Sequence, residues 1–144
     1  MVAKVGKMTW GLVTGRFVVV RDYPARGMIT SAERAAFFDG VRRAVDQAAG
    51  DGDGLLIAHP DGCFLYPYLG RRPPTPIDYF HGKMISDGDL AELGGRIQSG
   101  VIRAVLIQAS PAGAAGGMAR LYAEATRRMT VGATVRDFHL FVRR

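Results

Sequence analysis

The sequence predicts a small α/β fold, a layered sandwich with a mostly parallel sheet and about three helices. Three observations predict it. Short β-branched or apolar runs alternate along the chain with segments of helical periodicity. One run, residues 55–58, is apolar at every position, which is typical of a strand buried on both faces of a sheet. No linker-like composition or internal repeat divides residues 16–144, so we expect them to form a single domain.

The first half of the chain predicts strands on either side of one long helix. Residues 16–23 (RFVVVRDY) form a β-branched run typical of a strand. Thr30 and Glu33 have the spacing of a capping box, which predicts that a helix begins there. Its apolar face is predicted to consist of Phe37, Phe38, Val41, Ala44, Val45 and Ala48, and Gly50 ends it. The turn GDGDG leads into strand 55–58, and residues 63–70 (CFLYPYLG) are expected to be an extended aromatic segment.

The second half predicts two more helices and two more strands. Residues 71–84 are rich in proline and are expected to form a loop. Ser86 begins a helix that Gly100 ends, and residues 101–108 (VIRAVLIQ) form the clearest strand. The loop SPAGAAGG precedes a third helix over 118–129. Residues 134–143 alternate between apolar and polar, which predicts a terminal strand that could pair antiparallel at an edge.

Composition excludes several classes of protein. Of the 144 residues, 48% are hydrophobic and 22% charged, which is typical of a globular domain and not of a disordered chain. The single cysteine, Cys63, excludes an internal disulfide and is expected to be a buried structural thiol. The three histidines lack metal-ligand spacing, so we expect neither a metal site nor a cofactor. The sequence contains no apolar run of about 20 residues that could cross a bilayer.

The formal net charge of +6 comes mostly from arginine. Arginine pairs recur at 42–43, 71–72, 127–128 and 143–144, on different predicted elements. They do not cluster on one face as a nucleic-acid interface requires, so nucleic acid is not an expected partner. The same charge is compatible with attraction to an anionic membrane surface.

Two loops at the ends of predicted strands are candidate binding sites. His59 and Asp61 directly follow strand 55–58, and ligands bind at the carboxyl ends of strands in open α/β sheets. Gly113, Gly116 and Gly117 lie between a strand and a helix, where backbone N–H groups can bind an anion. Either loop could instead serve only as a turn, because Pro and Gly are also ordinary turn residues.

Residues 55–74 (LLIAHPDGCFLYPYLGRRPP) carry a family pattern. It consists of a hydrophobic strand, a Pro-x-Gly turn, aromatic residues, and Leu69-Gly70-Arg71 with prolines close behind. This segment resembles the soluble C-terminal domain of polytopic GT-C class glycosyltransferases, related to protein mannosyltransferases and the aminoarabinose transferase of lipid A. Residues 85–108 and 121–144 are similar to later segments of that domain, so the resemblance covers 16–144. The chain lacks the family's usual Thr before Gly70.

The resemblance implies an accessory domain on the extracytoplasmic face of the cell membrane. In that family the catalytic acidic residue lies in an early loop between membrane helices, so no catalytic residue is expected here. Residues 1–15 would be an N-terminal extension or the remnant of a membrane-proximal linker. The expected partners are the transmembrane part of the same polypeptide or an anionic membrane surface, with a lipid-linked sugar or its acceptor as ligand. Tyr66, Tyr68, Arg71 and Arg72 would contact that ligand, since aromatic rings stack on sugars and arginine pairs with phosphate.

The residues also leave an alternative open. The chain could be a free-standing cytoplasmic module that binds a phosphorylated small molecule. Its site would then be His59 with Asp61, or the glycine loop at 113–117.

Overall fold

The centre of the fold is a four-stranded sheet. The computed structural model describes residues 17–19, 29–50, 52, 54–76, 85–109 and 116–143. The strands of the sheet lie in the order β3-β4-β6-β5. Their bounds are Leu55–Ala58 for β3, Ala104–Gln108 for β4, Phe138–Val142 for β6 and Thr130–Val135 for β5. A separate antiparallel pair joins β1 (Phe17–Val19) to β2 (Ile29–Ser31).

The sheet is mixed. β3 and β4 pair in parallel, whereas β6 is antiparallel to both β4 and β5. The predicted α/β class is confirmed, and the last strand is antiparallel. Antiparallel pairing is nevertheless more extensive than the sequence indicated, because the predicted terminal strand is the second arm of a hairpin. The first arm, β5, is the edge strand, and β6 lies inside the sheet.

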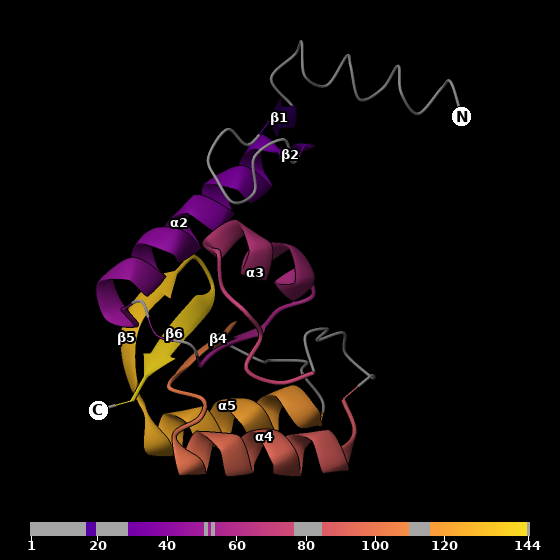
Figure 1. Ribbon diagram of the computed structural model, residues 1–144, viewed down its shortest axis with the longest axis vertical. Helices are drawn as coiled ribbons and strands as arrows, with labels where there is room; N and C mark the ends of the chain where they lie inside the picture. The colour runs from indigo at the N-terminus through magenta and orange to yellow at the C-terminus, as the bar shows by residue number, and fades with distance from the viewer. Residues whose placement is uncertain are drawn as a thin grey trace.

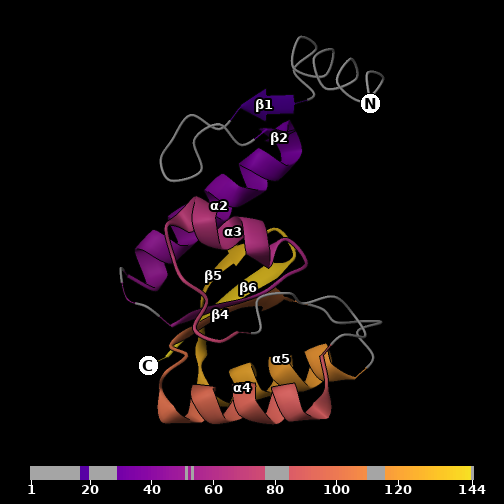
Figure 2. The same cartoon turned by 45° about the vertical axis from the view of Figure 1, so that its right-hand side comes forward.

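Of the described helices, two cover each face of this sheet (Figures 1 and 2). α2 (Ala32–Ala48) and α3 (Gly62–Leu69) lie on one face, and α4 (Asp87–Ser99) and α5 (Gly117–Arg128) lie on the other. Consecutive strand residues point to opposite faces. Leu55 and Ile57 therefore pack with α2 and α3, whereas Leu56 and Ala58 pack with α4 and α5. This explains why residues 55–58 are apolar at every position.

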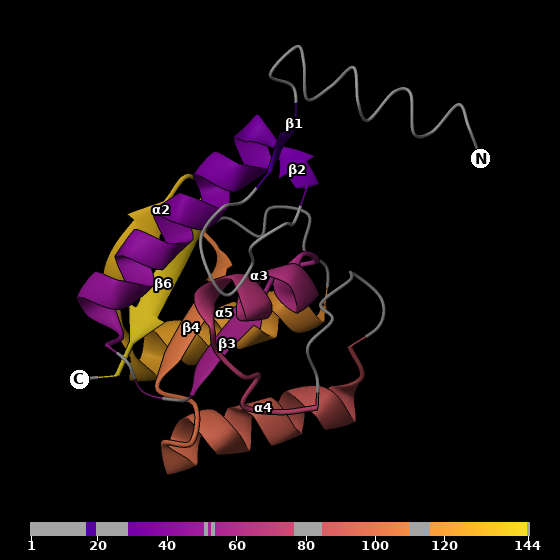
Figure 3. The same cartoon turned by 45° about the horizontal axis from the view of Figure 1, so that its top comes forward.

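α2 begins one residue later than the predicted capping box. Ser31 is the N-cap, and its hydroxyl accepts a hydrogen bond from the Arg34 backbone N–H at 3.1 Å. Thr30, the predicted cap, is instead the middle residue of β2 and is buried. The predicted apolar face is confirmed: Phe37, Phe38, Val41, Ala44 and Val45 are buried in the core. Figure 3 shows β1 and β2 beside the start of α2, at the end of the molecule away from α4 and α5.

α3 corrects the prediction of an extended aromatic segment. Pro67 lies inside this helix and cannot donate the hydrogen bond of an ordinary helical residue. Burial of Leu65, Tyr66 and Tyr68 compensates, and Gly70 ends the helix at a left-handed φ of 66°. The Tyr66 hydroxyl donates to the Leu55 carbonyl (3.1 Å) and accepts from the Ile57 N–H (2.9 Å). It thus satisfies backbone groups of β3, which is an edge strand of the sheet.

The remaining elements follow the sequence closely. Ser86 caps α4 in a capping box with Asp89, and Gly100 ends the helix. α5 occupies the region predicted for the third helix. Residues 71–76 form no helix or strand, as predicted, and 77–84 lie outside the described residues. Among the helices that the structure describes, none has the length and apolar character to span a membrane.

Candidate functional site

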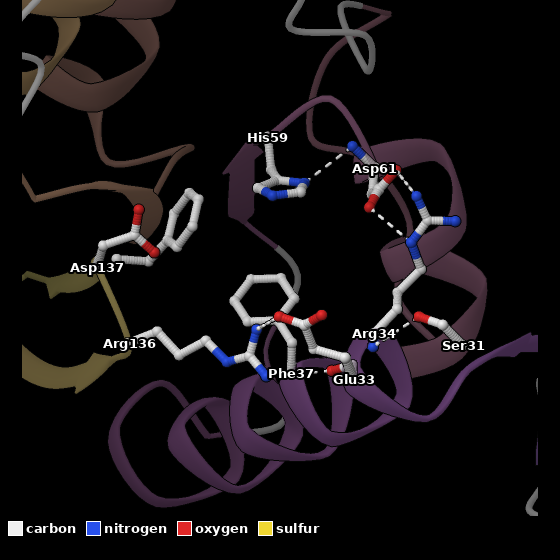
Figure 4. A pocket seen from close by; sticks show the side chains of 9 residues that line it. Ser31, Glu33, Arg34, Phe37, His59, Asp61, Arg136 and Asp137 are labelled. Atoms are coloured by element: carbon white, nitrogen blue, oxygen red, sulfur yellow. Dashed lines mark hydrogen bonds and ion pairs between the residues drawn. The ribbon is translucent and has the colours of Figure 1, made fainter. Parts of the chain in front are cut away.

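A cleft of about 330 Å³ lies at the carboxyl end of β3 (Figure 4). Three segments that are distant in sequence form it. The start of α2 contributes Ser31, Glu33, Arg34 and Phe37; the turn after β3 contributes His59 and Asp61; and the β5–β6 hairpin contributes Arg136, Asp137 and Phe138. The structure therefore brings the predicted pair His59 and Asp61 together at the strand end, in a cavity of ligand size.

His59 forms one wall of the cleft together with two phenylalanines. Its ring centroid lies 5.3 Å from that of Phe37 and 4.9 Å from that of Phe138. Nδ1 accepts a hydrogen bond from the Asp61 backbone N–H at 2.9 Å, so the neutral ring carries its proton on Nε2. Burial lowers the pKa of His59, and the opposing effect of the Asp61 charge is smaller. His59 is therefore uncharged at neutral pH and offers an N–H donor.

Asp61 and Arg34 form a two-pronged ion pair on one side of the cleft. Nε of Arg34 lies 3.1 Å from Oδ2 of Asp61, and Nη2 donates to Oδ1 at 3.2 Å. The guanidinium and carboxylate match geometrically, so the pair holds α2 against the start of α3. The Arg34 side chain remains 48% exposed, which leaves other N–H donors accessible from the cleft.

Arg136 and Glu33 form the second ion pair. Nη1 of Arg136 donates to Oε1 of Glu33 and Nη2 donates to the Glu33 carbonyl, both at 3.2 Å. Arg136 is the first of the two turn residues between β5 and β6, and its φ of 54° is left-handed. This conformation costs a non-glycine residue about 1–2 kcal/mol. The Arg136 guanidinium carbon also lies 5.7 Å from the centroid of the Phe37 ring. This contact and the bonds to Glu33 help to offset that cost.

Asp137 joins the cleft to the end of β4. Its carboxylate accepts from the Gln108 side-chain amide at 2.9 Å, and its carbonyl accepts from the Ala109 N–H at 2.6 Å. The lining of the cleft thus contains three carboxylates, those of Glu33, Asp61 and Asp137. It contains two guanidinium groups, those of Arg34 and Arg136. Because His59 is neutral at pH 7, the lining carries one net negative charge.

The tyrosines predicted to contact a ligand lie in the core. Tyr66 and Tyr68 are 3% and 2% exposed, so the expectation that their rings stack on a sugar is wrong. The Tyr68 hydroxyl donates to Asp39, and the guanidinium of Arg42 lies 4.2 Å from the centroid of its ring. The prediction fails for Tyr66 and Tyr68 because residues 62–69 form a helix and not an extended segment, and this helix turns both rings toward the core.

The predicted arginines lie away from the cleft. Arg71 donates to the carbonyls of Gly52 (2.6 Å) and Gly50, and so it ties the end of α3 to the loop before β3. Arg72 is exposed beside it. Cys63 is also exposed, contrary to the prediction of a buried thiol.

The glycine loop is described only in part. Gly113 lies outside the described residues, Gly116 is the N-cap of α5, and Gly117 is the first residue of that helix. A Cβ on Gly117 would lie 3.2 Å from a methyl carbon of Leu90, so this glycine lets α5 approach α4 closely. In the part of the chain that the structure describes, no group of three or more His, Cys, Asp or Glu side chains is placed to hold a metal ion.

Comparison with protein-family models, curated proteins and solved structures gave no match. Any functional assignment therefore rests on the residues of this chain and on their geometry.

Proposed function

We propose that this chain is a soluble extracytoplasmic accessory domain of an integral-membrane glycosyltransferase that uses a lipid-phosphate-linked sugar donor. It would not catalyse sugar transfer alone. Its role would be to cover the membrane-embedded site and shape the entrance for donor or acceptor. The pattern in residues 55–74 and its continuation to residue 144 support this assignment.

The structural observation that carries the proposal is an exposed apolar pair beside the cleft. Val19 and Ile29 are cross-strand partners in the β1–β2 pair and are 44% and 38% exposed. Directly opposed residues on neighbouring strands lie on the same face. Ser31 is two residues after Ile29, shares that face of β2, and lines the cleft. A domain that rests on a membrane-embedded partner would need such an apolar contact next to the opening of its polar site.

The charge of the cleft disfavours the alternative, binding of a phosphorylated small molecule. A cavity at His59 and Asp61 is what that alternative predicts. However, both arginines of the lining are already paired with carboxylates, and the lining has one net negative charge. A phosphate would be repelled by this lining unless it displaced those carboxylates.

The size and location of the native gene product test the proposed function. An antibody raised against this chain is used on fractionated source cells, with membranes washed at high salt and at alkaline pH. We expect a band several times larger than 15.5 kDa that stays with the washed membranes. A soluble band near 15.5 kDa would refute the proposal.

A further inference from the structure

Hydrogen-bond donors and acceptors alternate around the cleft. Figure 4 shows Arg34 with Asp61 on one side, Arg136 with Asp137 on the other, and the Glu33 carboxylate between them. Each guanidinium has five N–H donors, and the ion pairs described above use two of them in each arginine. A hydroxyl group both donates and accepts, so neighbouring hydroxyls are best matched where donors and acceptors lie side by side.

The remaining wall of the cleft is aromatic. Phe37, His59 and Phe138 form a triangle whose ring centroids lie 4.9 to 5.3 Å apart. Aromatic faces pack well against the C–H face of a sugar ring. Phe37 is only 7% exposed and backs the wall, so the half-buried rings of His59 and Phe138 form its accessible part. Nε2 of His59, which carries the proton of the neutral ring, adds a donor at the edge of this wall.

We propose that this cleft binds the uncharged, polyhydroxylated ring of a sugar. Arg34 and Arg136 donate to ring hydroxyls, Glu33 and Asp137 accept from them, and the aromatic wall contacts the C–H face. The inference rests on the proposed function for the choice of a sugar over another polyhydroxylated ligand. The net negative lining selects against a phosphate group, so a lipid-linked donor would place its sugar here and its phosphate elsewhere.

Ligand-observed NMR on the purified 144-residue chain tests this inference. The probes are the methyl glycosides of mannose, glucose and galactose, compared with mannose 1-phosphate and inorganic phosphate. We expect saturation transfer to the ring protons of at least one methyl glycoside at millimolar concentration, and weaker binding of both phosphates. Backbone amide signals of His59, Asp61 and Asp137 should shift on addition of that glycoside, whereas the signal of Glu124 on α5 should not.

Isosteric variants locate the binding. Glu33→Gln and Asp137→Asn keep the shape of the lining and remove an anionic acceptor, so each should weaken glycoside binding about tenfold. The matched control is Glu124→Gln, which alters an ion-paired carboxylate on the opposite face of the sheet and should leave affinity unchanged. Circular dichroism shows whether each variant is folded, and the amide shifts of the wild-type chain locate the site independently of any variant.

Three results overturn the inference: no saturation transfer from any glycoside of the panel, tighter binding of a phosphate than of the glycosides, or amide shifts confined to other regions. These results are separable from failure of the proposed function. A large membrane-bound native product whose domain binds no glycoside refutes only the sugar cleft. A soluble 15.5 kDa product that binds a glycoside refutes only the membrane assignment.

Discussion

Ser31 and Thr30 are neighbours whose hydroxyls lie in opposite environments. The Ser31 hydroxyl caps α2, whereas the Thr30 hydroxyl is buried and has no hydrogen-bond partner among the described residues. We expect Ser31→Ala to lower the free energy of unfolding by about 1 kcal/mol, because the cap is lost. Thr30→Val should leave it unchanged or raise it, because an unsatisfied hydroxyl is replaced by a methyl group. Urea denaturation measures both, and the reverse order would show that Thr30 is the cap.

His59 makes folding stability depend on pH. Burial lowers its pKa below the usual value of 6.5, so at intermediate pH the unfolded chain binds a proton that the folded protein does not. The stabilisation that neutral His59 contributes is therefore complete above pH 6.5. It is lost as the pH falls from 6.5 toward the lower pKa of His59 in the folded protein. We expect the free energy of unfolding to decrease as the pH falls from about 7 through 6.5 and below, measured by urea denaturation. His59→Gln should flatten this part of the profile, and a profile that keeps its slope in this variant would show that another group causes the pH dependence.

At the residue scale, the sequence predicts only part of the cleft. His59 and Asp61 could be found because they follow a buried strand. Glu33 and Arg136 are 103 positions apart, and no local pattern indicates that they meet. The turn that positions Arg136 also lacks the Asn-Gly or Asp-Gly signal of a tight hairpin, because an arginine takes the left-handed conformation. Without the hairpin, the third side of the cleft could not be predicted.

Among the elements, α4 offers two glycine substitutions with opposite expected effects, one inside the helix and one at its C-cap. Gly95 is an exposed helix-interior residue with open space around its Cα, so Gly95→Ala should stabilise the protein by about 0.5–1 kcal/mol through helix propensity. Gly100 ends the helix at φ of 81°, and a Cβ there would lie 2.1 Å from Nη1 of Arg143. Gly100→Ala should therefore destabilise by about 1–2 kcal/mol. Thermal unfolding of the two variants measures both effects, and a similar shift for both would contradict the capping role of Gly100.

Elements with strong end signals were predictable, and those defined by tertiary contacts were not. α4 has Ser86 at its start and Gly100 at its end, and the sequence indicates both. α3 contains Pro67 and three aromatic residues, which favour extended structure locally. It is helical because that geometry buries Tyr66 and lets its hydroxyl bond the backbone of β3. β5 has β-branched residues at four of its six positions, but Gly132 interrupts their alternation where the pairing with β6 shifts register, so the pairing with β6 defines this strand.

In the whole molecule, the β1–β2 pair lies at one end, and α4 and α5 lie at the other (Figure 1). The cleft adjoins the first of these ends, because Ser31, the last residue of β2, lines it. The two ends of the molecule therefore offer different surfaces to a membrane. If the end bearing the cleft faces a bilayer, Val19 and Ile29 are placed to enter its surface. Other exposed apolar residues, such as Val101 after α4 and Val131 in β5, lie on different elements and are not part of this pair.

Vesicle binding tests which end of the molecule contacts a bilayer. Purified chain is mixed with anionic phospholipid vesicles, and the bound fraction is measured by co-sedimentation at low and high salt. The net charge of +6 adds an attraction that high salt screens, while the apolar contact persists. We expect Val19→Ser/Ile29→Ser to weaken binding at high salt at least about tenfold, because burying the two side chains is worth about 2–4 kcal/mol. The matched control Val101→Ser/Val131→Ser removes apolar side chains that are 50% and 48% exposed and should bind as the wild type does. Equal loss in both double variants would mean that the chain has no preferred membrane-facing end.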